Sequence, residues 1–239
     1  MNSLERKLMM GMIDILNEHS DILTEDQINI RLEDLKQFEK ETGFILTNSP
    51  TQKKKPIGTS SNFKAPFLAE CSSIENVIKF AKDKELVASV NLKGGNISLI
   101  YKDGIFSEVK TNDIEVQKLI KQFENMPLKI NKEGVYIVSG KVVTIQEKLK
   151  FYLYDVVEGG NDKLFDNLHE AEILGFDVVP YWIMSTINPK KFQNNIDNIC
   201  EYADEDGLPH NGVMLRYNNI EYVKSLSIID NYRNGIIYN

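Results

Sequence analysis

The sequence predicts an α+β fold built mainly on antiparallel sheet. Strand-like runs follow one another through short turns instead of alternating regularly with helices. One such turn, Asp103-Gly104, combines two residues that tolerate the positive φ of a tight hairpin. The 239 residues, 42% apolar and 26% charged, suffice for one or two domains with a sizeable core.

Two helices open the chain. Apolar residues three and four positions apart predict a first helix that ends near His19. Its expected core-facing side comprises Leu4, Leu8, Met9, Met12, Ile13 and Leu16. Thr24 and Gln27 fit a capping box at the start of a second helix, and Gly43 is a plausible stop. The apolar face of this helix comprises Ile28, Leu32, Leu35 and Phe38. We expect residues 1–46 to form a small helical subdomain and residues 47–239 a second domain.

A polar stretch from Thr47 to Lys64 predicts a linker or extended loop. Its lysine triplet, Lys53-Lys54-Lys55, could contact phosphate. Short charge runs are usually solvent-exposed, which favours a solvated loop.

The remaining chain predicts about nine strands and three further helices. Helices are expected at 73–84, at 164–174 and from Pro189, where Asn188 is the cap. Strands are expected at 86–92, 97–101, 105–109, 135–145, 151–157, 176–184, 213–217 and 235–238.

Composition excludes several classes of protein. The net charge of −7 argues against nucleic-acid binding as the main role of the protein. No apolar run approaches the ~20 residues of a membrane span, and the first residues lack a signal-peptide cleavage site. Cys71 and Cys200 favour two buried thiols in a reducing, cytoplasmic setting over a nucleophile, because no partner base is evident. With three histidines and no CxxC, we expect no metal site.

Seven segments, in the same order, resemble the N-terminal part of bacterial NAD-dependent DNA ligases. In that family a helical NMN-binding subdomain precedes an adenylation (nucleotidyltransferase) domain, so the resemblance implies this fold. The matching segments are Asn48–Gln52 (family SPTQ), Ile97–Gly104, Val138–Val142 (RGE), Gly175–Val178 (GF-x-V), Leu208-Pro209, Asn211–Arg216 (DGVVVK) and Arg233–Asn239.

The same alignment implies that the family's chemistry is altered. Its KxDG lysine attacks the α-phosphate of NAD, whereas Asn91 and Lys93 stand at the lysine and aspartate positions. An amide nitrogen has a delocalised lone pair and cannot be adenylated. Asn211 replaces an aspartate, and Asn239 replaces a phosphate-binding lysine. Within RGE, Ser139 and Lys141 replace the arginine and glutamate, and Arg216 replaces the lysine of DGVVVK. The NMN contacts of the helical subdomain have no counterpart.

These substitutions predict a catalytically inactive homologue that acts as a nucleotide-binding or protein-interaction module. Lys93, Lys141 and Arg216 would line a vestigial pocket for an anion such as NAD or AMP, with no cofactor required. The alternative is an active nucleotidyltransferase in which Lys93 is the adenylated lysine. A third possibility is a partner for a separate ligase or replication protein, docking through the helical unit. The family's later DNA-encircling domains have no match here, so we expect weak or absent nucleic-acid binding.

Overall fold

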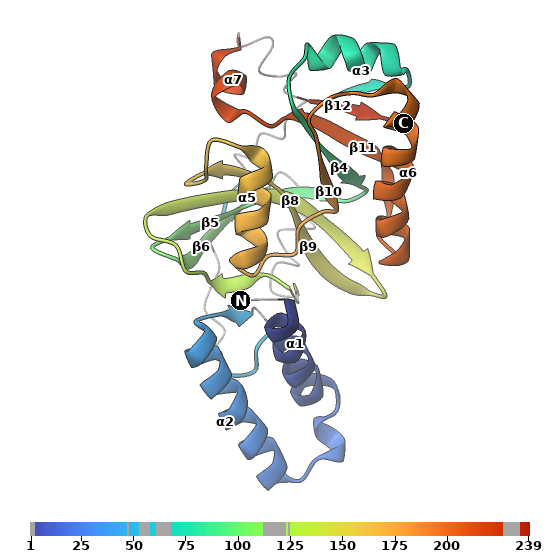
Figure 1. Ribbon diagram of the computed structural model, residues 1–239. Helices are drawn as coiled ribbons and strands as arrows, with labels where there is room; N and C mark the ends of the chain where they lie inside the picture. Colours follow the sequence, from blue (N-terminus) through green and yellow to red (C-terminus); the bar gives the residue numbers. More distant parts are fainter. Residues whose placement is uncertain are drawn as a thin grey trace.

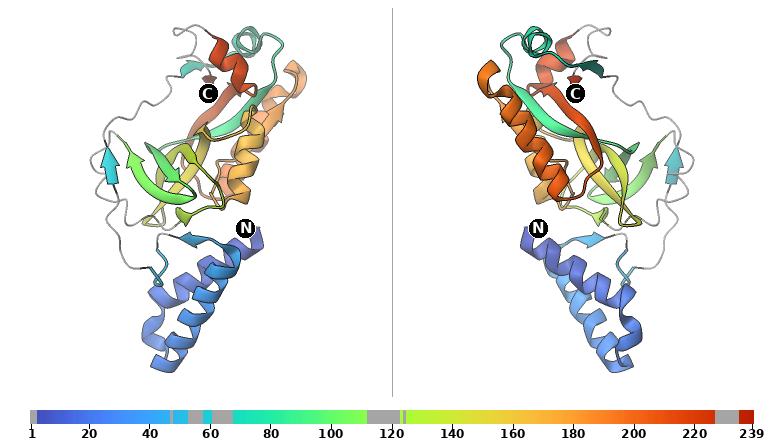
Figure 2. Two further views of the ribbon diagram at one scale, coloured as in Figure 1. Left: turned by 90° about the vertical axis from the view of Figure 1, so that its left-hand side faces the viewer. Right: turned by 90° about the vertical axis from the view of Figure 1, so that its right-hand side faces the viewer.

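The computed structural model describes residues 3–46, 48–52, 58–60, 68–111, 123, 125–226 and 235–239. Two mainly antiparallel sheets with flanking helices form most of the molecule, and a helical hairpin projects from one end (Figures 1 and 2). This architecture confirms the α+β class. Among the predicted features, the lysine triplet at 53–55 and Arg233 lie outside the described residues.

The helical hairpin consists of α1 (Ser3–Glu18) and α2 (Glu25–Thr42), with a short 3₁₀ turn, η1 (Ser20–Ile22), between them. The capping box is present, since Thr24 and Gln27 each bond the other's backbone N–H, and Gly43 ends α2 in the left-handed conformation. The hairpin core contains Met9, Ile13, Leu16, Leu35, Phe44 and Leu46.

One part of the predicted inward band is wrong. Leu4 and Leu8 are 76% and 54% exposed, whereas Met9 and Ile13 are fully buried. Residues 4 and 8 share one stripe of the helix, and residues 9, 13 and 16 share another, about a quarter turn away. Because a two-helix contact covers only a narrow stripe, the second stripe is fully or almost fully buried, and in the first only Met12 packs partly against the core.

The larger sheet holds the hairpin predicted at Asp103-Gly104, and both of these residues have positive φ. Its strand order is β1 (Ile45–Leu46), β7 (Pro127–Lys129), β6 (Ile105–Lys110), β5 (Gly95–Lys102), β8 (Val135–Ile145) and β9 (Lys148–Glu158), with β2 (Gly58–Ser60) parallel to β6. Helix α5 (Leu164–Ile173) packs its apolar side onto this sheet's core.

The smaller sheet has the order β10 (Tyr181–Met184), β4 (Leu86–Leu92), β11 (His210–Tyr217), β12 (Gly235–Tyr238) and β3 (Ala69–Cys71). Helices α3 (Ile74–Ala81) and α6 (Pro189–Glu205) contribute to its core, and α7 (Ile220–Ser225) follows β11. Asn188 caps α6 as predicted, accepting from the backbone N–H of Lys190.

The single strand predicted at 176–184 is two separate segments. Val178 bridges to Leu153 of the larger sheet, whereas Tyr181–Met184 pairs with β4 of the smaller sheet. Pro180 lies between them, and proline cannot donate to a ladder. The chain therefore passes from one sheet to the other at Pro180. The short strands β1, β2, β3 and β7 and helix α7 were not predicted from the sequence.

Polar contacts join the helical hairpin to the rest of the molecule. The Arg6 guanidinium lies 3.0 Å from the Asp177 carboxylate and donates to the Asn125 carbonyl at 3.2 Å. Glu18 pairs with Lys148 at the other end of α1. At the base of the hairpin, the buried Glu39 carboxylate accepts hydrogen bonds from the Ser49 and Thr51 hydroxyls, both at 2.5 Å. The SPTQ-like segment thus anchors the chain as it leaves α2.

Candidate functional site

Strand β4 directs Asn91 into the space between the two sheets. Leu86, Ala88, Val90 and Leu92 pack in the core that contains α6, whereas Val87 packs in the core of the larger sheet. Side chains alternate along a strand, so Asn91 shares the face of Val87. Asn91 is 6% exposed, so a polar side chain there requires a partner.

That partner is Asn211. The Asn91 Nδ2 group donates to the Asn211 side-chain oxygen at 2.9 Å and to its backbone oxygen at 3.2 Å. The register between β11 and β4 shifts between His210 and Val213, and this irregularity includes Asn211. Gly212 has φ +76°, and a Cβ there would lie 2.2 Å from the Tyr238 carbonyl oxygen. Only glycine fits both restrictions, so Gly212 holds the loop that presents Asn211 to Asn91.

Asn239 completes a row across β4, β11 and the end of β12. Its backbone N–H donates to the Cys71 carbonyl at 3.1 Å, and its side-chain oxygen lies beside Gly212. Three positions that sequence analysis marked as degenerate, Asn91, Asn211 and Asn239, therefore lie together. All three are neutral amides.

The two lysines lie on adjacent backbone segments at one edge of this region. Lys93 is exposed at the end of β4, and its backbone N–H donates to the Pro209 carbonyl at 2.8 Å. Gly94 packs so closely on β8 that a Cβ would lie 2.2 Å from the Val142 oxygen. Lys141, the residue before Val142, is half-buried, and burial lowers its pKa. No hydrogen bond or ion pair engages its ammonium among the described residues.

Arg216 is placed differently from the two lysines. It is 3% exposed and lies between the sheets, where its guanidinium pairs with the Asp155 carboxylate at 3.2 Å. The same guanidinium donates to the Tyr154 carbonyl and lies 5.5 Å from the centre of the Tyr154 ring. Its charge is thus already balanced within the protein, and Arg216 ties β11 to β9.

Sequence reasoning missed two polar partners in this region. Asp155 is the counterion of Arg216, and its place in an apolar strand run was the available signal. Ser139, which the ligase resemblance aligns with an arginine, shares a 2.7 Å hydroxyl contact with Ser98. That pairing follows from the β5–β8 register, which sets Ser98 opposite Ser139.

The predicted cysteine burial is only partly correct. Cys71 and Cys200 are free and half-buried. Burial raises the pKa of both thiols. Within the described part of the chain, no three His, Cys, Asp or Glu side chains gather as a metal site. No described helix is long and apolar enough to cross a membrane.

The sequence of the chain is similar to that of a DNA ligase. No protein-family model matches the chain. A DNA ligase of Lachnoclostridium phytofermentans is 23% identical over an alignment 282 positions long, which spans 92% of this chain and 42% of the ligase. An archaeal ATP-dependent RNA ligase structure has a TM-score of 0.46 at 9% identity, covering 73% of this chain and 47% of that one. A putative ATP-dependent DNA ligase from Aquifex aeolicus has a TM-score of 0.45 at 12% identity, covering 86% and 61%. The chain is a distant homologue of a DNA ligase and spans less than half of that ligase's length.

Proposed function

We propose that this chain is a catalytically inactive homologue of the adenylation domain of NAD-dependent DNA ligases, acting as a binding module for a nucleotide or another protein. The observation that carries the proposal is the amide pair between Asn91 and Asn211. In the ligase resemblance these are the positions of the nucleophilic lysine and of an aspartate. Here each satisfies the other, and neither offers a nucleophile or a negative charge.

The rival function is an active nucleotidyltransferase with Lys93 as the adenylated lysine. Lys93 is two residues beyond Asn91, a displacement of about 6–7 Å along a strand. Attack on phosphorus requires placement within about 1 Å of a productive geometry. Lys93 is also exposed to solvent just beyond β4, whereas Asn91, at the position of the nucleophile, is buried.

The residues present fit an anionic ligand better than they fit adenylyl transfer. Lys141 is a half-buried cation without a described partner, and Lys93 lies on the neighbouring turn. A bound nucleotide such as AMP or NAD would supply a phosphate as their counterion. Arg216 takes no part in this proposal, because Asp155 and Tyr154 already occupy its guanidinium.

The helical hairpin is the region we propose for protein binding, with a separate ligase or replication protein as the partner. Four large apolar side chains on it are exposed: Leu4, Leu8, Ile22 and Ile30, between 54% and 77%. Replacing Leu4 and Leu8 by serine should abolish co-purification with such a partner without lowering the melting temperature. Unchanged co-purification would contradict this assignment.

Adenylation is tested by intact-mass spectrometry after incubation with NAD or ATP and magnesium. We expect no added AMP. An adduct that disappears in Lys93→Ala would overturn the proposal in favour of the active enzyme.

Nucleotide binding is tested separately by thermal shift with AMP, ATP, NAD and NMN. We expect stabilisation by a phosphate-bearing ligand that is lost in Lys141→Ala and kept in Lys102→Ala, an exposed lysine at the far end of β5. Equal loss in both variants would show that Lys141 is not the anchor.

A further inference from the structure

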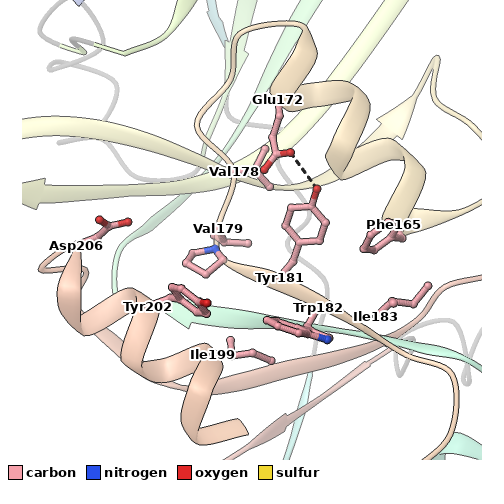
Figure 3. Close-up of a pocket in the computed structure, with 11 residues that line it drawn as sticks. Phe165, Glu172, Val178, Val179, Tyr181, Trp182, Ile183, Ile199, Tyr202 and Asp206 are labelled. Atoms are coloured by element: carbon pink, nitrogen blue, oxygen red, sulfur yellow. Dashed lines mark hydrogen bonds between the residues drawn. The ribbon is translucent and has the colours of Figure 1, made fainter. Parts of the chain in front are cut away.

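A second site lies away from the asparagine row, along the outer edge of β10. The β10 groove, with a volume of about 500 Å³, lies between α5, α6 and β10 (Figure 3). The aromatic and acidic side chains that line it are Phe165, Glu172, Tyr181, Trp182, Tyr202 and Asp206. Strand β10 ends the smaller sheet, and none of the described strands pairs with its outer side.

The outer edge of β10 presents backbone groups suited to another strand. Val90 donates its N–H to the Pro180 carbonyl, so Pro180 and Val90 form a hydrogen-bonded pair. In an antiparallel ladder such pairs alternate, which assigns Trp182 to the next bonded pair with Ala88. The N–H and C=O groups of Tyr181 and Ile183 therefore point outward, into the groove. This edge selects an extended polypeptide rather than a helix.

Aromatic side chains form both walls of the groove. Trp182 and Tyr202 stand toward α6, and they are 48% and 54% exposed. Tyr181 and Phe165 stand toward α5, with ring centres 5.4 Å apart. The Tyr181 hydroxyl donates to the Glu172 carboxylate at 3.1 Å, which orients that carboxylate at the rim (Figure 3). Aromatic faces beside carboxylates are suited to cationic side chains.

The charge at the groove is negative on both sides. Glu172 lies on the α5 side and Asp206 on the α6 side (Figure 3). The end of α6 is unusually acidic, with Glu201, Asp204, Glu205 and Asp206, and its last turn has no basic residue. Negative charge at a helix C-terminus is unfavourable, because the exposed carbonyls there already carry partial negative charge. A cationic partner would relieve this repulsion.

We propose that the β10 groove binds an extended, lysine- or arginine-bearing segment of another protein, which adds a strand to β10. Adjacent residues of such a strand face opposite sides of the sheet. Two consecutive basic residues would thus reach both walls, one toward Asp206 and one toward Glu172. The proposal is independent of whether the asparagine row binds a nucleotide.

The sole tryptophan of the chain gives a direct readout, because Trp182 lies in the groove. The probe is an acetylated and amidated peptide, Ser-Val-Lys-Lys-Val-Ser, which contains no aromatic residue. Titration into the full chain should shift Trp182 emission to shorter wavelength in a saturable way, since docking removes water from the ring. Raising the salt concentration should weaken binding, because the carboxylates are exposed. A peptide with glutamates in place of the lysines should produce no shift.

Backbone methylation separates strand addition from charge attraction. Two versions of the peptide carry N-methyl groups on alternate amides, in opposite phases. The peptide whose methylated amides face β10 should bind at least fivefold more weakly than the parent peptide. The peptide whose methylated amides face away from β10 should bind like the parent. Equal affinity of both versions, or the same emission shift with free lysine amide, would overturn the proposal.

Variants of the protein test the groove itself. Tyr202→Ala and Asp206→Asn should each weaken binding about two- to fivefold. Ile183→Pro should weaken it about fivefold or more while preserving the sheet, because proline is tolerated where the N–H faces out from an edge strand. Asp34→Asn, which removes an equal charge from the exposed face of α2, is the matched control and should bind like the parent chain. If Asp34→Asn weakened peptide binding as much as Asp206→Asn does, the effect would depend on net charge alone. That result would refute the proposed site.

Discussion

Arg216 provides the sharpest test of how this molecule is held together. Replacing it by methionine keeps much of the aliphatic volume but removes the cation between the sheets. The Asp155 carboxylate then loses its counterion, and the Tyr154 carbonyl loses its donor. We expect a large loss of stability and little direct effect on nucleotide binding.

The magnitude follows from burial. Breaking a buried ion pair by removing one partner costs about 3–5 kcal/mol. The Arg216 side chain is 4% exposed, but that of Asp155 is 24% exposed, so water can partly solvate the remaining carboxylate. We therefore expect Arg216→Met to lower the free energy of unfolding by about 3 kcal/mol, the lower end of that range. For a chain of this length, that loss lowers the melting temperature by about 6–12 °C.

The assay is urea unfolding followed by circular dichroism, with a matched series of variants. Arg216→Lys keeps the charge but lacks the planar guanidinium that bonds the Asp155 carboxylate and the Tyr154 carbonyl together. It should therefore lower the free energy of unfolding by about 1–2 kcal/mol. A double-mutant cycle with Asp155→Asn should give a favourable coupling energy. The reasoning is refuted if Arg216→Met unfolds within about 0.5 kcal/mol of the parent chain, the range of an ordinary surface substitution. Loss of AMP binding in that stable variant would instead make Arg216 a ligand residue.

Four further outcomes are expected. Asn91→Lys alone should give no AMP adduct by intact mass, because Asn211 and Asn239 would stay neutral where the ligase resemblance expects an aspartate and a lysine, and such groups act as a unit; a measurable adduct would contradict this. Thr24→Ala should lower the free energy of unfolding by about 1 kcal/mol through loss of the cap on α2, and an unchanged urea midpoint would argue against it. Both cysteines should react with iodoacetamide more slowly than free cysteine at pH 7.5, with rates rising toward higher pH, because a raised thiol pKa leaves less thiolate; mass spectrometry over time gives the rates. Nicked duplex DNA should bind weakly at physiological salt in view of the net charge of −7, and submicromolar affinity with a steep salt dependence would refute this.

Local sequence rules predicted the elements that depend on neighbouring residues. The capping box at Thr24, the turn at Asp103-Gly104 and the cap at Asn188 all form as expected. Each depends on residues within one turn of the chain, so the sequence contains the whole cause. Strand β8 was predicted with both ends correct, because its long β-branched run is unambiguous.

Predictions failed where a distant partner decides the outcome. Leu4 and Leu8 have the same periodicity as a core stripe, and only the position of α2 leaves them exposed. The strands β1 and β7 are two and three residues long, too short for a pattern, and each is stabilised by the other. Pro180 was visible in the sequence, but its effect, the passage between two sheets, required knowing both pairings.

The candidate site shows the same division. The sequence by itself determined that Asn91, where the ligase resemblance expects the nucleophilic lysine, has no amine. Only the tertiary structure decided that Asn91 bonds Asn211, that Lys141 has no described counterion and that Arg216 is committed to Asp155. The reason is physical: reactivity is fixed by covalent chemistry, whereas the availability of a charge depends on burial and on partners that folding brings from distant strands.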